Sequence, residues 1–188
     1  MKLTTLDLML LLLYANKGEK VVGKIKLAKL IFIASKEISL PGVEIETKEF
    51  IPYKEGPYPV DFNDIIDFAT EQNLMEVEND RIFKITSFGK RKIEEIFGNK
   101  KEILTEIEKI KEKFNKIPDD LLLAYVYLKY PGYTGRSEIK RDILEVIKKQ
   151  FASFKLVARR KKISEADVER AIEEARLATL QKLRRSPE

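Results

Sequence analysis

Hydrophobic positions in the first part of the chain recur at the spacing of α-helices. An apolar run predicts a helix over residues 3–14, beginning near Thr4 or Thr5 and ended by the polar residues at 16–18. Apolar side chains cover most of the circumference of a second helix, over residues 23–38, which indicates a central core helix. A third helix is expected over residues 60–72, with its apolar side chains at helical spacing: Phe62, Ile65, Ile66, Phe68 and Ala69.

The pattern changes from helical to strand-like after the third helix. Residues 74–77 and 81–85 are rich in strand formers and flank the polar residues 78–80, so they predict a short β-hairpin. A long charged helix is expected over residues 90–113, with a break at Gly98 and Asn99 dividing it. Before the third helix, residues 43–51 alternate loosely and predict a short strand. The proline-punctuated residues 52–59 are expected to form a rigid loop.

Three more helices are expected, over residues 119–130, 137–151 and 164–183, with Ser137 and Ser164 as N-caps of the last two. The order of three helices, a two-stranded wing and a helix is that of a winged helix-turn-helix. We therefore expect a mainly α fold with a small β-hairpin. It would comprise a winged-helix-like domain over residues 1–117, a helical extension packed on it over 118–150, and a basic segment with a C-terminal helix over 151–188.

The chain has 188 residues and contains neither cysteine nor histidine. The missing cysteine excludes disulfides, zinc–cysteine sites and cysteine nucleophiles, and the missing histidine removes the commonest general base and metal ligand. We therefore expect a protein that is not an enzyme and binds no cofactor or metal, with an enzyme that uses carboxylates as an alternative. Abundant Lys, Glu and Ile without cysteine is typical of a thermophile.

The longest apolar run, residues 8–15, is shorter than the roughly 18 residues that a membrane-spanning helix needs. Asp7 interrupts the apolar stretch, and no cleavage site made of small residues follows it, so a leader peptide is not expected. The run is better explained as a buried helix. We expect a cytoplasmic protein that does not bind membranes.

The positive charge of the chain is concentrated in its last quarter. Residues 1–100 carry 15 Lys and Arg against 16 Asp and Glu, whereas residues 136–188 carry 15 against 9. This asymmetry predicts a nucleic-acid partner for the C-terminal part, with a solvated charged helix as the alternative. A phosphate would also offset the four consecutive cations beside the positive end of the last helix. The candidate nucleic-acid-binding residues here are Lys155, Arg159, Arg160, Lys161, Lys162, Arg184 and Arg185.

The third predicted helix has the opposite charge. Asp61, Asp64, Asp67 and Glu71 lie along it, and no Lys or Arg occurs over residues 60–73. These carboxylates would repel a phosphate backbone, so we expect the helix to bind a basic protein partner and not to contact bases, with a solvated acidic face or a metal site as the alternatives. Cations in and after the hairpin are further candidates for phosphate contacts, with ordinary surface lysines as the alternative: Lys84, Lys90, Arg91 and Lys92.

Three short motifs are shared with one known family. Residues Lys26-Leu27-Ala28-Lys29-Leu30 match a Lys-Leu-x-Lys-Leu-like helix, and Thr86-Ser87-Phe88-Gly89-Lys90 fit a Thr-x-x-Gly-Lys turn. Between them, an aromatic-x-Pro-Tyr-x-x-Gly-Pro-aromatic loop is matched by Phe50, Pro52, Tyr53, Gly56, Pro57 and Tyr58. Over residues 5–145 the chain thus resembles the SocA-type antitoxin or Panacea domain and its uncharacterised bacterial and archaeal relatives. The resemblance implies a non-catalytic winged-helix-like module that acts through protein contacts.

We therefore expect a non-catalytic regulatory protein with two binding functions. Its basic C-terminal part would bind nucleic acid without strong sequence preference. Its N-terminal domain would bind a toxin-like or regulatory protein through Pro52, Tyr53, Gly56, Pro57, Tyr58, Asp61, Asp64 and Asp67. The alternative is an antitoxin-like or proteolysis-adaptor module without a nucleic-acid role, in which the last helix docks a partner or forms a homodimer.

Overall fold

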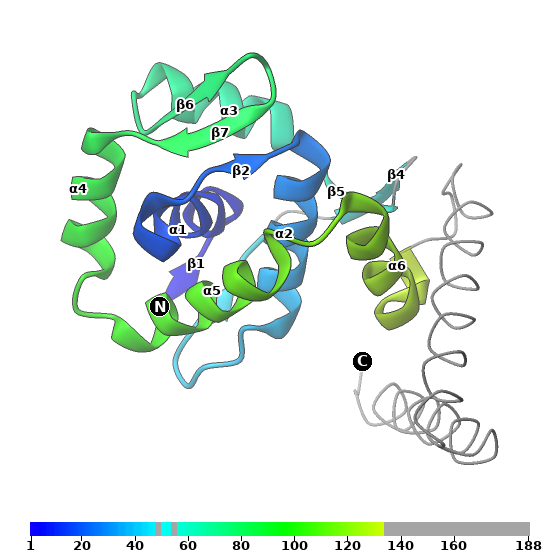
Figure 1. Cartoon of the computed structure of the whole chain (residues 1–188). Helices are drawn as coiled ribbons and strands as arrows, with labels where there is room; N and C mark the ends of the chain where they lie inside the picture. Colours follow the sequence, from blue (N-terminus) through cyan, green and yellow to red (C-terminus); the bar gives the residue numbers. More distant parts are fainter. Residues whose placement is uncertain (48–49, 54–55, 134–188) are drawn as a thin grey trace, which may run out of the picture. The chain divides into compact units, whose positions relative to one another are not determined.

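The computed structural model describes residues 1–47, 50–53 and 56–133 (Figure 1). The description below concerns the unit Met1–Lys140. The helices predicted over 137–151 and 164–183 lie outside the described residues, and the predicted domain boundaries stay predictions. Within the described part the fold is mainly helical with small sheets, which confirms the expected class.

Helix α1 (Thr5–Gly18) begins at the residue that the sequence predicts. The side chain of Thr4 accepts a hydrogen bond from the backbone N–H of Asp7, and the Asp7 carboxylate accepts one from the backbone N–H of Thr4. Helical backbone angles end before residue 15, and Asn16 and Lys17 adopt left-handed φ values of +53° and +62°. The predicted stop at residues 16–18 is therefore confirmed. Of the two residues, Lys17 has the long side chain for which the left-handed conformation is unfavourable.

Helix α2 (Lys24–Glu37) is the central core helix that the sequence predicts. All residues from 27 to 34 are buried, so α2 contacts neighbours around its full circumference. Figure 1 shows α1 in the middle of the unit, with α2, α4 (Ser87–Phe97) and α5 (Lys101–Phe114) around it. The break predicted at Gly98 and Asn99 is confirmed, because α4 and α5 are separate helices joined there.

A three-stranded antiparallel sheet lies at one end of the unit, beside α3 (Phe62–Glu71) (Figure 1). Its strands β6 (Met75–Glu78) and β7 (Ile82–Ile85) form the predicted hairpin, and a third strand, β2 (Val21–Val22), pairs with β7. The sequence did not predict β2, because two residues between two helices are too short a run to show alternation. The resulting strand order is β2-β7-β6.

The proline-rich segment before α3 is a second hairpin, so the predicted loop over residues 52–59 is wrong. Strands β4 (Phe50–Tyr53) and β5 (Gly56–Pro59) pair antiparallel, with Pro52 opposite Pro57. A two-stranded hairpin with free outer edges tolerates prolines, because their missing N–H groups need not face a neighbouring strand. The strand predicted over 43–51 is split between β4 and the two-residue β3 (Glu44–Ile45), which pairs in parallel with β1 (Lys2–Leu3).

Lys111 on α5 lies inside the core and donates hydrogen bonds to backbone carbonyls at the end of α1. Its side chain is fully buried, and its Nζ lies 3.0 Å from the carbonyl oxygen of Ala15 and also contacts that of Glu19. Burial lowers the pKa of Lys111 from its ordinary 10.5 to about 8, despite the opposing effect of the Glu19 carboxylate. The ammonium thus fixes the carbonyl groups that the left-handed turn leaves without helical partners.

Two lysines of α2 also donate hydrogen bonds to backbone carbonyl oxygens of other segments. Nζ of the buried Lys29 lies 2.9 Å from the carbonyl oxygen of Pro57 and so holds β5 against the core helix. Nζ of Lys26 lies 2.8 Å from the carbonyl oxygen of Ile117 and 3.1 Å from Oδ1 of Asp119. Both residues belong to the part of α2 that the sequence pattern would leave to solvent, yet both are used internally.

Helix α6 (Asp119–Lys129), followed by the 3₁₀ turn Pro131–Tyr133, is joined to α2 by a polar cluster around Glu37. Oε1 of Glu37 accepts hydrogen bonds from Tyr125 and Lys129 at 2.7 Å and from Tyr130 at 3.2 Å. Burial would raise the pKa of the Glu37 carboxyl, but the hydrogen bonds from Lys129 and the tyrosines outweigh it and lower the pKa below 4.5.

No helix in the described part of the chain is long and apolar enough to cross a bilayer.

Candidate functional site

The strongest candidate site in the described residues is the exposed side of α3. Phe62, Ile66 and Ala69 anchor the helix in the core and leave the opposite side to solvent. This acidic face, as we call it, consists of the exposed residues Asp64, Asp67, Phe68 and Glu71. The carboxylates lie where the sequence predicts. Asp61 differs from them, because it is half-buried at the start of the helix and forms no side-chain cap hydrogen bond with it.

An exposed aromatic ring lies beside these carboxylates. The Phe68 residue is 49% exposed, and Val60, just before α3, is 56% exposed. The sequence analysis placed Phe68 in the apolar stripe of the helix, which the structure corrects. Position 68 is six residues after the buried Phe62, and six residues turn a helix through about 600°, well away from the same side. That spacing was the signal that could have identified Phe68 as a surface residue. A large exposed apolar side chain beside charged residues is typical of a protein-binding surface.

The acidic character continues onto the neighbouring strand. Helix α3 packs against β6, where Glu76 and Glu78 are exposed. On the paired strand β7, Lys84 forms an ion pair with Glu78. Negative potential therefore spreads over two adjacent elements, which opposes the approach of a phosphate backbone and favours a basic surface.

Three of the predicted contact residues of the proline-rich segment pack against neighbouring helices. Gly56 and Pro57 are buried, and the Tyr127 ring lies against Gly56, where a Cβ atom would come within 3.0 Å of it. Tyr58 is half-buried and packs edge-on against Phe62, with ring centroids 5.3 Å apart. Gly56 and Pro57 are therefore packed against α6 and α2, through Tyr127 and through the hydrogen bond that Lys29 donates to the Pro57 carbonyl, and the partner contact expected of them stays a prediction. The backbones of Pro52 and Tyr53 form β4.

The four cations proposed in and after the hairpin are spread over β7 and α4. Besides the Lys84–Glu78 ion pair, Lys92 pairs with Glu95 at 2.8 Å. Arg91 and Lys92 lie 5.8 and 5.9 Å from the ring centroid of Phe88. Lys90 is half-buried beside Gly18. Two of the four thus have a carboxylate partner, which reduces the charge that they offer to a phosphate. The candidate nucleic-acid-binding residues of the C-terminal part lie outside the described residues: Lys155, Arg159, Arg160, Lys161, Lys162, Arg184 and Arg185.

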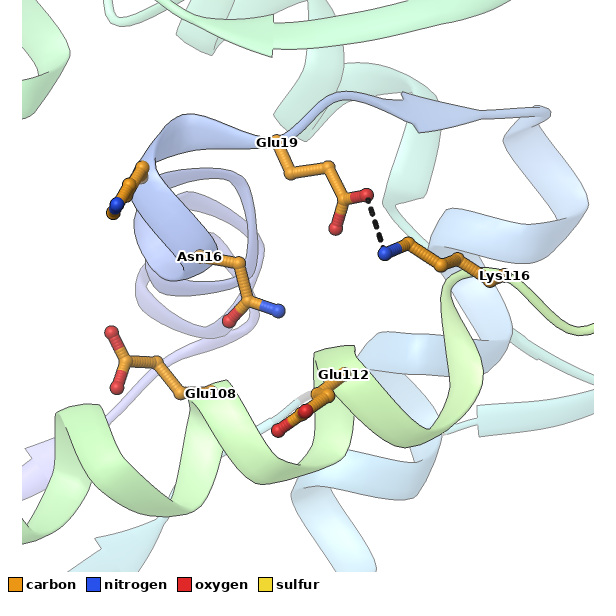
Figure 2. A pocket seen from close by; sticks show the side chains of 6 residues that line it. Asn16, Glu19, Glu108, Glu112 and Lys116 are labelled. Carbon is orange, nitrogen blue, oxygen red and sulfur yellow. Dashed lines mark ion pairs between the residues drawn. The ribbon is translucent and has the colours of Figure 1, made fainter.

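A polar hollow of about 550 Å³ lies between the end of α1 and α5. Figure 2 shows Asn16 and Glu19 on one side and Glu108, Glu112 and Lys116 on the other. Glu19 and Lys116 form an ion pair at 3.7 Å. Within the described residues, no three His, Cys, Asp or Glu side chains are arranged to hold a metal ion. The hollow is thus a mixed-charge surface depression and not a metal centre.

Comparisons with protein-family models, with curated proteins and with solved structures find no match to this chain.

Proposed function

We propose that the chain is a non-catalytic, winged-helix-like regulatory protein of the cytoplasm. Its order of elements supports this: α1, β2, α2, α3, β6 and β7 follow one another as three helices, a short strand and a two-stranded wing. The β3, β4 and β5 strands are an insertion between the second and third helices. In the sheet, β7 lies between β2 and β6, as a wing that packs beside a three-helix core requires. The resemblance to the SocA-type antitoxin or Panacea domain agrees with this proposal.

The first proposed activity is binding of a basic protein through the acidic face. The observation that carries it is the exposed Phe68 among the carboxylates of Asp64, Asp67 and Glu71, with no cation on the helix. An aromatic anchor beside charged residues gives affinity through burial of the ring and selectivity through the charges. The partner would therefore present an apolar pocket or side chain surrounded by Lys and Arg.

The test compares two triple variants with equal changes in charge and in exposed apolar area. The face variant is Asp64→Asn, Asp67→Asn and Phe68→Ser, and the matched control is Glu44→Gln, Glu102→Gln and Ile96→Ser, all at exposed positions. Proteins captured from the source cell would be purified and titrated calorimetrically against each chain. We expect a basic protein whose affinity falls by about tenfold or more for the face variant only. Equal affinity for both triple variants would refute the proposal.

The second proposed activity is binding of nucleic acid by the basic C-terminal part, which rests on the charge of residues 136–188 alone. The test is fluorescence anisotropy with labelled duplex DNA and with single-stranded RNA at several salt concentrations. Changing Arg159, Arg160, Lys161 and Lys162 to Ala should lower the slope of log K against log salt by about 3 to 4. Wild-type protein that binds neither probe at low salt would favour the alternative, an antitoxin-like or adaptor module without a nucleic-acid role.

A further inference from the structure

Negative and positive residues are separated along the chain at the turn of the β6–β7 hairpin. Residues 60–80, which include α3 and β6, contain seven Asp and Glu and no Lys or Arg. Residues 81–101, which include β7 and α4, contain seven Lys and Arg against two Glu. In Figure 1, α3 lies beside the sheet at the top, and α4 lies at the left edge of the unit, away from α3. One chain therefore presents a negative and a positive surface in different places.

The outer side of α4 combines apolar and positive side chains. Three buried residues anchor the helix to the core: Gly89, Ile93 and Phe97. On the outer side, Phe88 is 36% exposed and Ile96 is 56% exposed, and Lys92 lies between them, four residues from each. Residues four apart are neighbours on a helix, so the three side chains form one stripe. We call this stripe, together with the exposed Arg91, the α4 face.

The α4 face keeps a net positive charge. Arg91 forms no ion pair within the part of the chain that the structure describes. Lys92 pairs with the exposed Glu95 at 2.8 Å, and an exposed pair of this kind contributes little and can exchange partners. The other carboxylate of the helix, Glu94, accepts a hydrogen bond from Tyr14 of α1 at 3.3 Å. Glu95 therefore offsets one of the two cations, and the charge of Arg91 is left for a partner.

The acidic face of α3 has the same combination with the opposite sign. Its exposed Phe68 lies four residues after Asp64 and three residues before Glu71. Among the described residues, none of its three carboxylates forms an ion pair. Six large hydrophobic side chains are exposed in the described part of the chain, and four of them lie on or next to these two helices: Val60, Phe68, Phe88 and Ile96. The exposed apolar area is thus concentrated where the charges of opposite sign are.

We propose that the acidic face of one copy binds the α4 face of a second copy of this chain. The proposal rests on the proposed protein-binding function of the acidic face and names its partner. Contact between the faces would bury an aromatic ring from each side and pair carboxylates with Arg91 and Lys92 around them. Because the two faces differ, each copy can use them for two different neighbours. We expect a Kd of about 10 to 100 µM, since each helix offers a contact only about 15 Å long.

The test uses the full chain and two variants in which the charge of one face is reversed. The α3 variant is Asp64→Lys with Asp67→Lys, and the α4 variant is Arg91→Glu with Lys92→Glu. The control is Lys20→Glu with Lys24→Glu, which makes the same charge change as the α4 variant at exposed lysines without an ion pair in the described residues. Sedimentation equilibrium measures the weight-average mass of each chain from about 1 to 500 µM, a range that brackets the expected Kd.

The wild type and the control should both gain mass as the concentration rises. About 0.5 M KCl should weaken this association by roughly tenfold, because salt screens exposed charges. Each reversed variant alone should bind itself at least about tenfold more weakly, because its two faces then carry charge of the same sign. An equimolar mixture of the two variants should associate again, because the reversed face of each variant then meets the reversed face of the other.

Three outcomes would overturn the proposal: a wild type that stays monomeric at the highest concentration, an α4 variant that associates like the wild type, or a mixture of the two variants that stays monomeric. Loss of association in the four-residue tail variant but not in the α4 variant would also overturn it, and would identify the basic C-terminal part as the partner. The proposed function is tested separately, because it fails only if the face variant binds the captured basic protein as tightly as its control.

Discussion

Lys111 and Lys24 carry the same ammonium group in opposite environments. Inside the core, the charge of Lys111 is used by the carbonyl groups of Ala15 and Glu19, so none of it reaches the surface. At the sheet end, Lys24 is exposed and has no ion-pair partner among the described residues. The number of lysines in a segment therefore says little about its capacity to bind an anion. What counts is whether the ammonium already has an oxygen partner.

The comparison predicts that replacing a buried lysine lowers the free energy of unfolding, whereas replacing an exposed lysine leaves it nearly unchanged. The largest loss is expected in the core. Lys111→Met keeps most of the apolar stem but leaves two buried carbonyl groups without a donor. We expect the free energy of unfolding to fall by about 2 kcal/mol, measured by urea denaturation, with Lys101→Met on the surface nearly unchanged. Nucleic-acid affinity of the folded variant should equal that of the wild type. A more stable Lys111→Met chain would mean that burying the ammonium costs more than its hydrogen bonds contribute.

The pH dependence of stability gives a second measure of the same buried lysine. Its pKa is about 8 in the folded chain and about 10.5 when unfolded, so between these values the unfolded state binds the extra proton. The unfolding free energy of the wild type should therefore rise with pH above about 8, relative to Lys111→Met. Burial and the Glu37 contacts raise the pKa of Tyr125 and Tyr130 in both chains, so their effect above pH 10 cancels in the difference. Parallel pH profiles for the two chains would contradict this interpretation.

A third lysine environment lies between the two extremes, since Lys129 is half-exposed and bound to Glu37. Glu37→Gln should lower the free energy of unfolding at pH 7 by about 1 to 2 kcal/mol, because three donors lose a charged acceptor. The folded pKa of Glu37 is depressed, so its contribution is present above pH 4.5 and is lost as the pH falls further. Thermal unfolding of both chains at pH 7 and pH 3 measures this. An equal difference in stability between the wild type and Glu37→Gln at both pH values would argue against a role for the carboxylate charge.

A smaller change in the free energy of unfolding is expected from the backbone conformation of an exposed lysine, Lys17. Lys17 has a φ of +62°, which glycine adopts without steric cost. Lys17→Gly should raise the free energy of unfolding by about 1 kcal/mol. Lys20→Gly, at a residue without a positive φ, is the control and should be neutral or destabilising. Failure of Lys17→Gly to stabilise the chain would indicate that the Lys17 side chain contributes contacts that offset the strain.

The smallest effect on stability is expected at two exposed cations near the β2–β7 junction, Lys24 and Arg81. Lys24→Ala with Arg81→Ala removes exposed side chains that form no ion pair in the described residues, so the free energy of unfolding should change by no more than about 0.5 kcal/mol. A large loss of stability would show that these side chains support the β2–β7 junction.

Much of this fold could be predicted from the sequence alone, because the signals for helices, caps and turns lie in residues that are close together along the chain. Hydrophobic spacing predicted α1, α2, α3 and the β6–β7 hairpin, Thr4 marked the start of α1, and Gly98 the break between α4 and α5. The acidic character of α3 was also visible, since its four carboxylates are close in sequence.

Only the tertiary structure decided which charges are free and which residues meet. The two residues of β2 become a strand because β7 supplies their hydrogen bonds, and that pairing places Lys24 near Arg81. The proline-rich segment became a hairpin because Lys29 and Tyr127, distant in sequence, pack against β5. A lysine looks the same in the sequence whether it donates to a buried carbonyl or faces solvent, because that difference depends on contacts between residues far apart in the chain.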